Sequence, residues 1–85
     1  MNKKVFLVFE GNAWLSKSSL VLMGVYDSIE KAIPDILEEM SLRLLLNEEM
    51  TADKVANYLA REHQTQGFDT NYIIKTANLN EWEEV

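Results

Sequence analysis

One segment, Lys3 to Glu10, constrains the fold of this chain more than any other. Its middle is a run of consecutive apolar residues rich in Val and Phe, which favour the pleated surface of a sheet. Alternate residues of a strand point to opposite faces, so the run divides into two apolar sets, Val5, Leu7 and Phe9 against Phe6 and Val8. A strand that is apolar on both faces is typical of the centre of a sheet.

A second strand is predicted over Ser19 to Tyr26. A polar loop over residues 11–18, with Gly, Asn and Ser as turn residues, joins it to the first strand. The simplest arrangement is an antiparallel hairpin with a long loop. The loop carries Trp14, which either folds back onto the core or anchors a partner, since Trp is enriched at binding hot spots.

Two helices are predicted after the hairpin. The Asp-Ser pair at residues 27–28 supplies an N-cap, and apolar residues spaced by three and four predict a helix from near Ile29 to about Leu46. Pro34 lacks the amide hydrogen that a helix needs there, so we expect a kink or a split. Thr51 is a suitable N-cap for a second helix over Ala52 to His63.

A last strand is predicted over Asn71 to about Leu79. The order strand, strand, helix, helix, strand predicts an α+β fold, a two-layer ββααβ sandwich. Its three-stranded, mainly antiparallel sheet would carry both helices on one face. We place the first strand in the middle; the third strand pairs with the first or with the second, which periodicity does not decide. The length of 85 residues allows one domain, residues 1–85.

The start of the first helix resembles a group of small uncharacterised bacterial and phage-type domains. Residues 24–32, Gly-Val-Tyr-Asp-Ser-Ile-Glu-Lys-Ala, fit the pattern G-V-[FY]-[DST]-S-x-E-K-A of that group. The first strand fits as well, and so does a last strand that leads through Leu79 to Trp82. The resemblance departs in the middle of the chain, where the helical region is longer. It implies the hairpin and helix described above and carries no activity across.

The charge of the chain excludes several classes of partner. Eight basic residues stand against 14 acidic ones, a net charge of −6. Nucleic acids and anionic membranes need clustered Lys and Arg, so we expect neither as a partner. The chain has no cysteine, which excludes disulfides and thiolate chemistry. No apolar stretch approaches the roughly 20 residues that span a bilayer. We therefore expect a cytoplasmic protein.

The titratable side chains do not predict a catalytic or metal site. His63 is the only histidine and falls at a helix end, where it complements the helix dipole. Glu38 and Glu39 are adjacent, as are Glu48 and Glu49, so the members of each pair point about 100° apart on a helix and form no carboxylate dyad. The spacing of calcium ligands is missing. We predict no catalytic residue, no metal ligand, no cofactor and no enzymatic activity.

The sheet predicts an interaction surface, because two helices on one face leave the other uncovered. We expect the uncovered face to carry Phe6, Val8, Val21, Met23 and Val25, with either Tyr72 and Ile74 or Ile73 and Ala77 from the last strand. That is too much apolar surface for a small monomer to expose. The Trp14 loop, the tail with Trp82 or a second copy of the chain would cover it. An isologous homodimer is the simplest general solution, so we predict self-association.

These observations predict a non-enzymatic protein-interaction module, and the resemblance to phage-type domains implies that a phage or another mobile element encodes it. It would bind a protein partner through the uncovered sheet face, the Trp14 loop or an acidic helix face. The acidic face comprises Glu38, Glu39, Glu48 and Glu49. In one version the module is an inhibitor that presents these carboxylates to a basic site on its target, which electrostatic complementarity favours.

The alternative function is a small-ligand-binding or minor enzymatic domain. Its pocket would lie between helices and sheet, near Tyr58, His63 and Tyr72. A rise in melting temperature with one compound of a metabolite panel would support it. The spacing of the three residues does not require such a pocket, so the interaction module is the main prediction.

Overall fold

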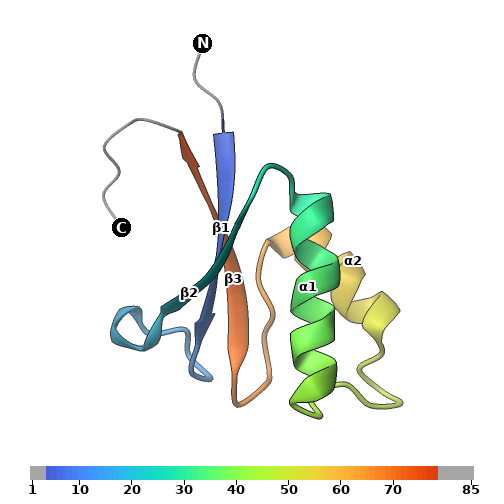
Figure 1. Ribbon diagram of the computed structural model, residues 1–85. Helices are drawn as coiled ribbons and strands as arrows, with labels where there is room; N and C mark the ends of the chain where they lie inside the picture. Colours follow the sequence, from blue (N-terminus) through green and yellow to red (C-terminus); the bar gives the residue numbers. More distant parts are fainter. Residues whose placement is uncertain (1–3, 79–85) are drawn as a thin grey trace.

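The computed structural model describes residues 4–78, which form a three-stranded antiparallel sheet and two helices (Figure 1). The elements are β1 (Lys4–Gly11), a 3-10 turn (Lys17–Ser19), β2 (Val21–Tyr26), α1 (Ile29–Leu42), α2 (Ala52–Glu62) and β3 (Asn71–Asn78). This order confirms the predicted α+β fold. Both helices lie on the same side of the sheet; α1 packs against β1 and β2, and α2 packs against α1.

The strand order is β2-β1-β3, with both pairs antiparallel, so β1 is central as predicted. β3 pairs with β1 along the whole strand, which decides the alternative left open by periodicity. The pairing of β1 with β2 has one irregularity, between Val8 and Phe9. Val8 pairs with Gly24 and Phe9 with Leu22, so Met23 is an extra residue, as in a β-bulge.

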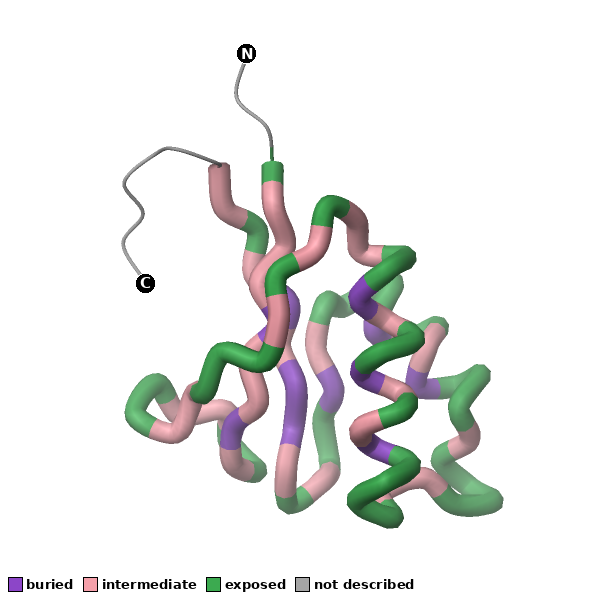
Figure 2. Tube along the Cα trace, in the orientation of Figure 1, coloured by how far each residue is buried: buried purple, intermediate pink, exposed green. Residues whose placement is uncertain are grey.

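The core lies between one face of the sheet and the helices (Figure 2). Its buried apolar residues are Val8, Ala32, Ile36, Met40, Val55, Leu59, Tyr72 and Ile74. The sheet contributes Val8 of β1 and Tyr72 and Ile74 of β3, and Val8 and Ile74 are cross-strand partners. No helix in the described part of the chain is long and apolar enough to cross a membrane.

The prediction that Phe6 and Val8 lie on the uncovered face is wrong. Val8 is 3% exposed in the core, and Phe6 packs against it. Alternation divides a strand into two sets of side chains, but it does not say which set the helices cover. Here Ile74 of β3 lies directly across from Val8 and is buried with it on the helix side, so the set of β1 side chains that contains Val8 faces the helices.

Among the three β2 residues predicted on the uncovered face, only Val25 lies there, beside Leu7. Val21 pairs with Glu10 of the helix-side set, and Met23 lines a pocket beneath α1. The prediction failed for Val21 and Met23 because the bulge inserts one residue and breaks the alternation of β2. An uncovered face does exist, made by Val5, Leu7, Phe9 and their cross-strand partners Leu22, Val25, Ile73, Lys75 and Ala77.

α1 begins as predicted and ends four residues earlier. The Ser28 side chain caps it by accepting a hydrogen bond from the Lys31 backbone N–H at 3.2 Å. The helix continues through Pro34 without a split. It ends in a Schellman-type turn in which the N–H groups of Leu44 and Leu45 donate to Ser41 and Met40 carbonyls. Leu44 has a positive φ of 59°, and the predicted extension to Leu46 is therefore wrong.

α2 also has the predicted N-cap, because the Thr51 hydroxyl accepts from the Lys54 N–H at 3.3 Å. The helix stops at His63, which adopts the left-handed conformation with a φ of 60°. The chain then runs beside β3: the His63 carbonyl accepts from the Ile74 N–H, and the Thr65 N–H donates to the Tyr72 carbonyl. This segment covers part of the outer edge of β3.

Candidate functional site

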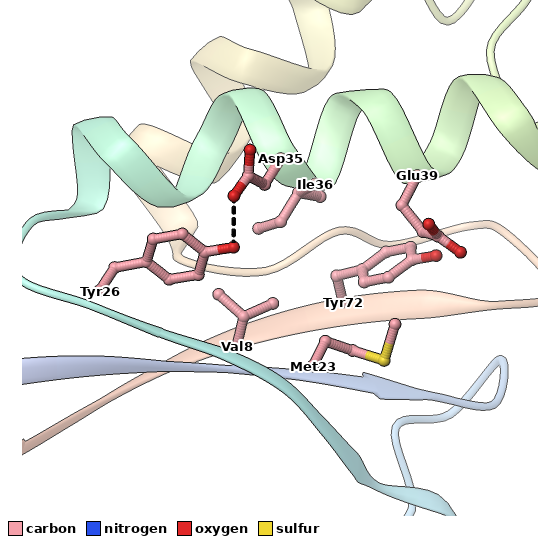
Figure 3. A pocket seen from close by; sticks show the side chains of 7 residues that line it. All are labelled: Val8, Met23, Tyr26, Asp35, Ile36, Glu39 and Tyr72. Carbon is pink, nitrogen blue, oxygen red and sulfur yellow. Dashed lines mark hydrogen bonds between the residues drawn. The ribbon is translucent and has the colours of Figure 1, made fainter.

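A pocket of about 160 Å³ lies between α1 and the edge of the sheet formed by β2 (Figure 3). β2 contributes Met23 and Tyr26, and α1 contributes Asp35, Ile36 and Glu39. Val8 of β1 and Tyr72 of β3 complete the lining. The pocket is therefore apolar on part of its wall, with two phenol groups and two carboxylates on the rest.

Tyr26 reaches from β2 across one side of the pocket to α1. Its hydroxyl donates a 2.7 Å hydrogen bond to Oδ2 of Asp35 (Figure 3). This hydrogen bond, followed by partial burial and the negative charge of Asp35, raises the pKa of Tyr26 to about 12. Gly24 makes room for the ring, because a Cβ atom there would lie 2.9 Å from Cε2 and from the hydroxyl of Tyr26.

Tyr72 forms the deep end of the pocket. The residue is 1% exposed, and its hydroxyl makes no hydrogen bond of good geometry within the described part of the chain, although the Glu10 carboxylate lies close enough to act on it. Burial, and then the nearby carboxylate of Glu10, raise the pKa of Tyr72 to about 12. A buried hydroxyl without a partner destabilises the protein by about 1–3 kcal/mol, so a bound group that reaches it gains an available hydrogen bond.

The charge around the pocket is negative. Arg43, just after α1, bonds two carboxylates: its Nε lies 3.0 Å from Oε1 of Glu39, and its terminal nitrogen lies 2.9 Å from Oε1 of Glu10. Asp35 accepts from the neutral Tyr26 hydroxyl. The three carboxylates of Glu10, Asp35 and Glu39 carry more negative charge than the one guanidinium of Arg43 balances. This excess favours a cationic ligand over an anionic one.

The edge of β2 borders this pocket and is open. Val21, Leu22, Met23 and Val25 are between 45% and 58% exposed, and β2 contains no charged residue. Figure 2 shows this strand exposed along most of its length. Among the described elements, only β1 pairs with it. Edge strands usually carry Lys, Pro or a covering segment against unwanted pairing, and among residues 4–78 the bulge is the one such device at this edge.

The Trp14 loop forms a second exposed surface. Trp14 is 85% exposed, so its side chain does not fold back onto the core. The loop is held by Asn12, whose Oδ1 accepts from the backbone N–H groups of Trp14 and Ser16 at 3.1 Å. The buried Asn71 donates to the Ala13 carbonyl and ties the loop to β3. Trp82 lies outside the described residues.

The four glutamates do not share one helix face. Glu38 and Glu39 belong to α1, and of these Glu39 lines the pocket. Glu48 and Glu49 lie in the segment between α1 and α2, where the Glu49 N–H donates to Asn47 Oδ1. The predicted acidic helix face is wrong in this respect, because α1 ends before it reaches the second pair.

Tyr58, His63 and Tyr72 do not form one pocket. Tyr58 lines a shallow groove of about 520 Å³ beside α2, together with Lys54 and Arg61. Its hydroxyl donates to Gln66 Oε1 at 2.9 Å, and the Arg61 guanidinium lies 5.6 Å from the ring centre. His63 is exposed at the end of α2. Among residues 4–78 no cluster of three or more His, Asp or Glu side chains could hold a metal ion.

Sequence reasoning missed Tyr26 and Asp35 as site residues. One signal was available: Gly24 lies two residues before Tyr26 in a strand, and a glycine there leaves room for a neighbouring ring on the same face. Asp35 gave no signal, because an acidic residue after Pro34 is ordinary on a helix surface.

Comparisons with known proteins add no identity: no family model matches, and no curated protein or solved structure is similar enough to match. The resemblance of residues 24–32 to small bacterial and phage-type domains therefore stays a prediction from those residues.

Proposed function

We propose that this protein is a non-enzymatic protein-interaction module, which binds a protein partner through the edge of β2. The observation that carries the proposal is the open, uncharged edge strand with exposed Val21, Leu22, Met23 and Val25. An added strand would pair with the backbone of β2 and bury these side chains. Such an edge is an aggregation hazard when nothing binds it, so its exposure favours a binding role.

The chemistry of the neighbouring pocket supports binding over catalysis. Its two phenols have pKa values raised to about 12, so both hold their protons at neutral pH. Efficient general acids and bases have pKa values near the working pH. The Asp35 and Glu39 carboxylates are engaged by Tyr26 and Arg43. These groups are suited to recognise a ligand. We place the module in the cytoplasm of a bacterium or of a phage-infected cell, as the sequence predicts.

The test is a pair of exposed apolar-to-lysine variants. Val25→Lys puts a charge on the open edge, while Leu44→Lys puts the same charge on a more exposed site after α1. Tagged wild type should capture a stoichiometric partner from the lysate of its own host. Val25→Lys should lose that partner and Leu44→Lys should keep it, with unchanged far-UV circular dichroism for both. Equal capture by the two variants would refute a role for the β2 edge.

A second copy of the chain is the other candidate occupant, as the sequence predicts. An antiparallel strand pair is self-complementary, and β2 exposes an edge that permits it. Light scattering at micromolar concentration measures this directly. A dimer that Val25→Lys converts to a monomer would assign the edge to self-association.

A further inference from the structure

The β2 edge and the pocket beneath α1 adjoin, and together they restrict the chemistry of the partner. We propose that the edge accepts an extended, basic segment of another protein, and that one Arg or Lys side chain of this segment enters the pocket. The inference rests on the proposed function, since it names the partner of the same surface.

The first argument is geometric. A segment that pairs with β2 continues the sheet, and its alternate side chains point to the helix side. Met23 and Tyr26 belong to β2 and also line the pocket, while Asp35 and Glu39 form the facing wall on α1 (Figure 3). A helix-side side chain of the added strand therefore meets the mouth of the pocket.

The second argument is size and polarity. A volume of about 160 Å³ is close to that of cavities that hold one benzene-sized group, and it is below the roughly 300–1,000 Å³ of sites for drug-sized ligands. One long side chain fits this space. Its methylene stem would contact Val8, Met23 and Ile36, while its cationic head would reach the carboxylates of the opposite wall.

The third argument is the Tyr72 hydroxyl, which is buried and has no partner among the described residues. Ammonium and guanidinium groups can only donate hydrogen bonds, and the hydroxyl oxygen can accept one. A carboxylate side chain in the same place would face Asp35 and Glu39 and be repelled. An apolar side chain would leave the hydroxyl unpaired. A cation can donate to the Tyr72 hydroxyl and is attracted by the Asp35 and Glu39 carboxylates, which keep their contacts with Tyr26 and Arg43.

The experiment uses arrays of short peptides with uncharged, β-favouring flanks of mixed sequence and one fixed central residue. The centre is Arg, Lys, norleucine or Glu. At physiological ionic strength the wild-type protein should bind the Arg and Lys pools about tenfold more tightly than the norleucine pool, the effect of one charge-assisted hydrogen bond. It should bind the Glu pool most weakly.

Two variants on α1 form a matched control. Asp35→Asn and Glu38→Gln each remove one negative charge, but of the two only Asp35 is among the residues that line the pocket. Asp35→Asn and Tyr72→Phe should reduce the preference for Arg and Lys, whereas Glu38→Gln should keep it. Equal loss in Asp35→Asn and Glu38→Gln would show attraction by net charge and would overturn the pocket assignment.

The remaining outcomes separate this inference from the proposed function. The wild-type protein could bind all four pools equally, and Val25→Lys could abolish this binding. That result would support the interaction module and would overturn the proposal of a cationic partner. If light scattering shows a dimer and no pool binds, the proposal of a basic partner segment is overturned, and a second copy of the chain is the occupant of the edge. No binding of any pool by a monomer would overturn both.

Discussion

Tyr26 and Tyr72 line the same pocket, yet removing their hydroxyls should change stability in opposite directions. Tyr26 donates a 2.7 Å hydrogen bond to Asp35, whereas the Tyr72 hydroxyl is buried with no partner in the described chain. Phenylalanine keeps the ring in both cases, so each substitution changes little apart from the hydroxyl.

The magnitudes follow from these surroundings. Tyr72→Phe removes an unpaired buried hydroxyl, which costs about 1–3 kcal/mol, and we expect the free energy of unfolding to rise by about 1 kcal/mol. Tyr26→Phe loses a bond to a carboxylate that stays accessible to water, and we expect a fall of about 1 kcal/mol. In a domain of this size each change moves the melting temperature by about 4–8 °C.

Urea unfolding followed by far-UV circular dichroism measures both effects. Equal slopes for the two variants and the wild type would show that the midpoints report stability alone. The midpoint should rise for Tyr72→Phe and fall for Tyr26→Phe. A fall of similar size for Tyr72→Phe would mean that its hydroxyl has a strong partner, and the reasoning about the deep end of the pocket would be refuted.

Three further predictions concern the stability of the fold. Leu44→Gly should raise the free energy of unfolding by about 0.5–1 kcal/mol in the same urea assay, because Leu44 has a φ of 59° and is 87% exposed. A lower free energy of unfolding would show that the Leu44 side chain has a structural role. Leu59→Ala should lower the free energy of unfolding by about 2–5 kcal/mol, since Leu59 is fully buried between the layers. A smaller decrease would contradict the described core. Because the folded protein raises the pKa values of Tyr26 and Tyr72 above the ordinary 10 to about 12, their contribution to stability is complete below pH 10 and is lost as pH rises through about 12. Urea midpoints should therefore fall over this range, less steeply in either Phe variant, and a pH-independent midpoint would contradict the raised pKa values.

Much of the fold could be predicted from local sequence signals. Ser28 and Thr51 mark both helix starts because a side-chain oxygen three residues before a backbone N–H can cap it. The central position of β1 followed from its two apolar faces. The end of α1 could not be predicted, because Leu44 takes a left-handed conformation in which glycine is usual.

The candidate site was less accessible to sequence reasoning because it depends on register. Glu39 and Met23 were named as interaction residues, but for an acidic helix face and an open sheet face rather than for a pocket. Which face of β1 the helices cover is set by contacts between distant segments, such as Val8 with Ile74. The unpartnered hydroxyl of Tyr72 is visible only once those segments are packed.

The bulge opposite Val8 and Phe9 gives this pocket an unusual dependence on chain length. Met23 forms part of the pocket wall because β2 has one residue more than β1 at this point. Deletion of that residue would restore regular pairing between the two strands and take the Met23 side chain out of the wall, even if every other side chain stayed the same. In chains built on this plan, the loss or gain of a single codon in the second strand would reshape the pocket, a larger step than most substitutions can take.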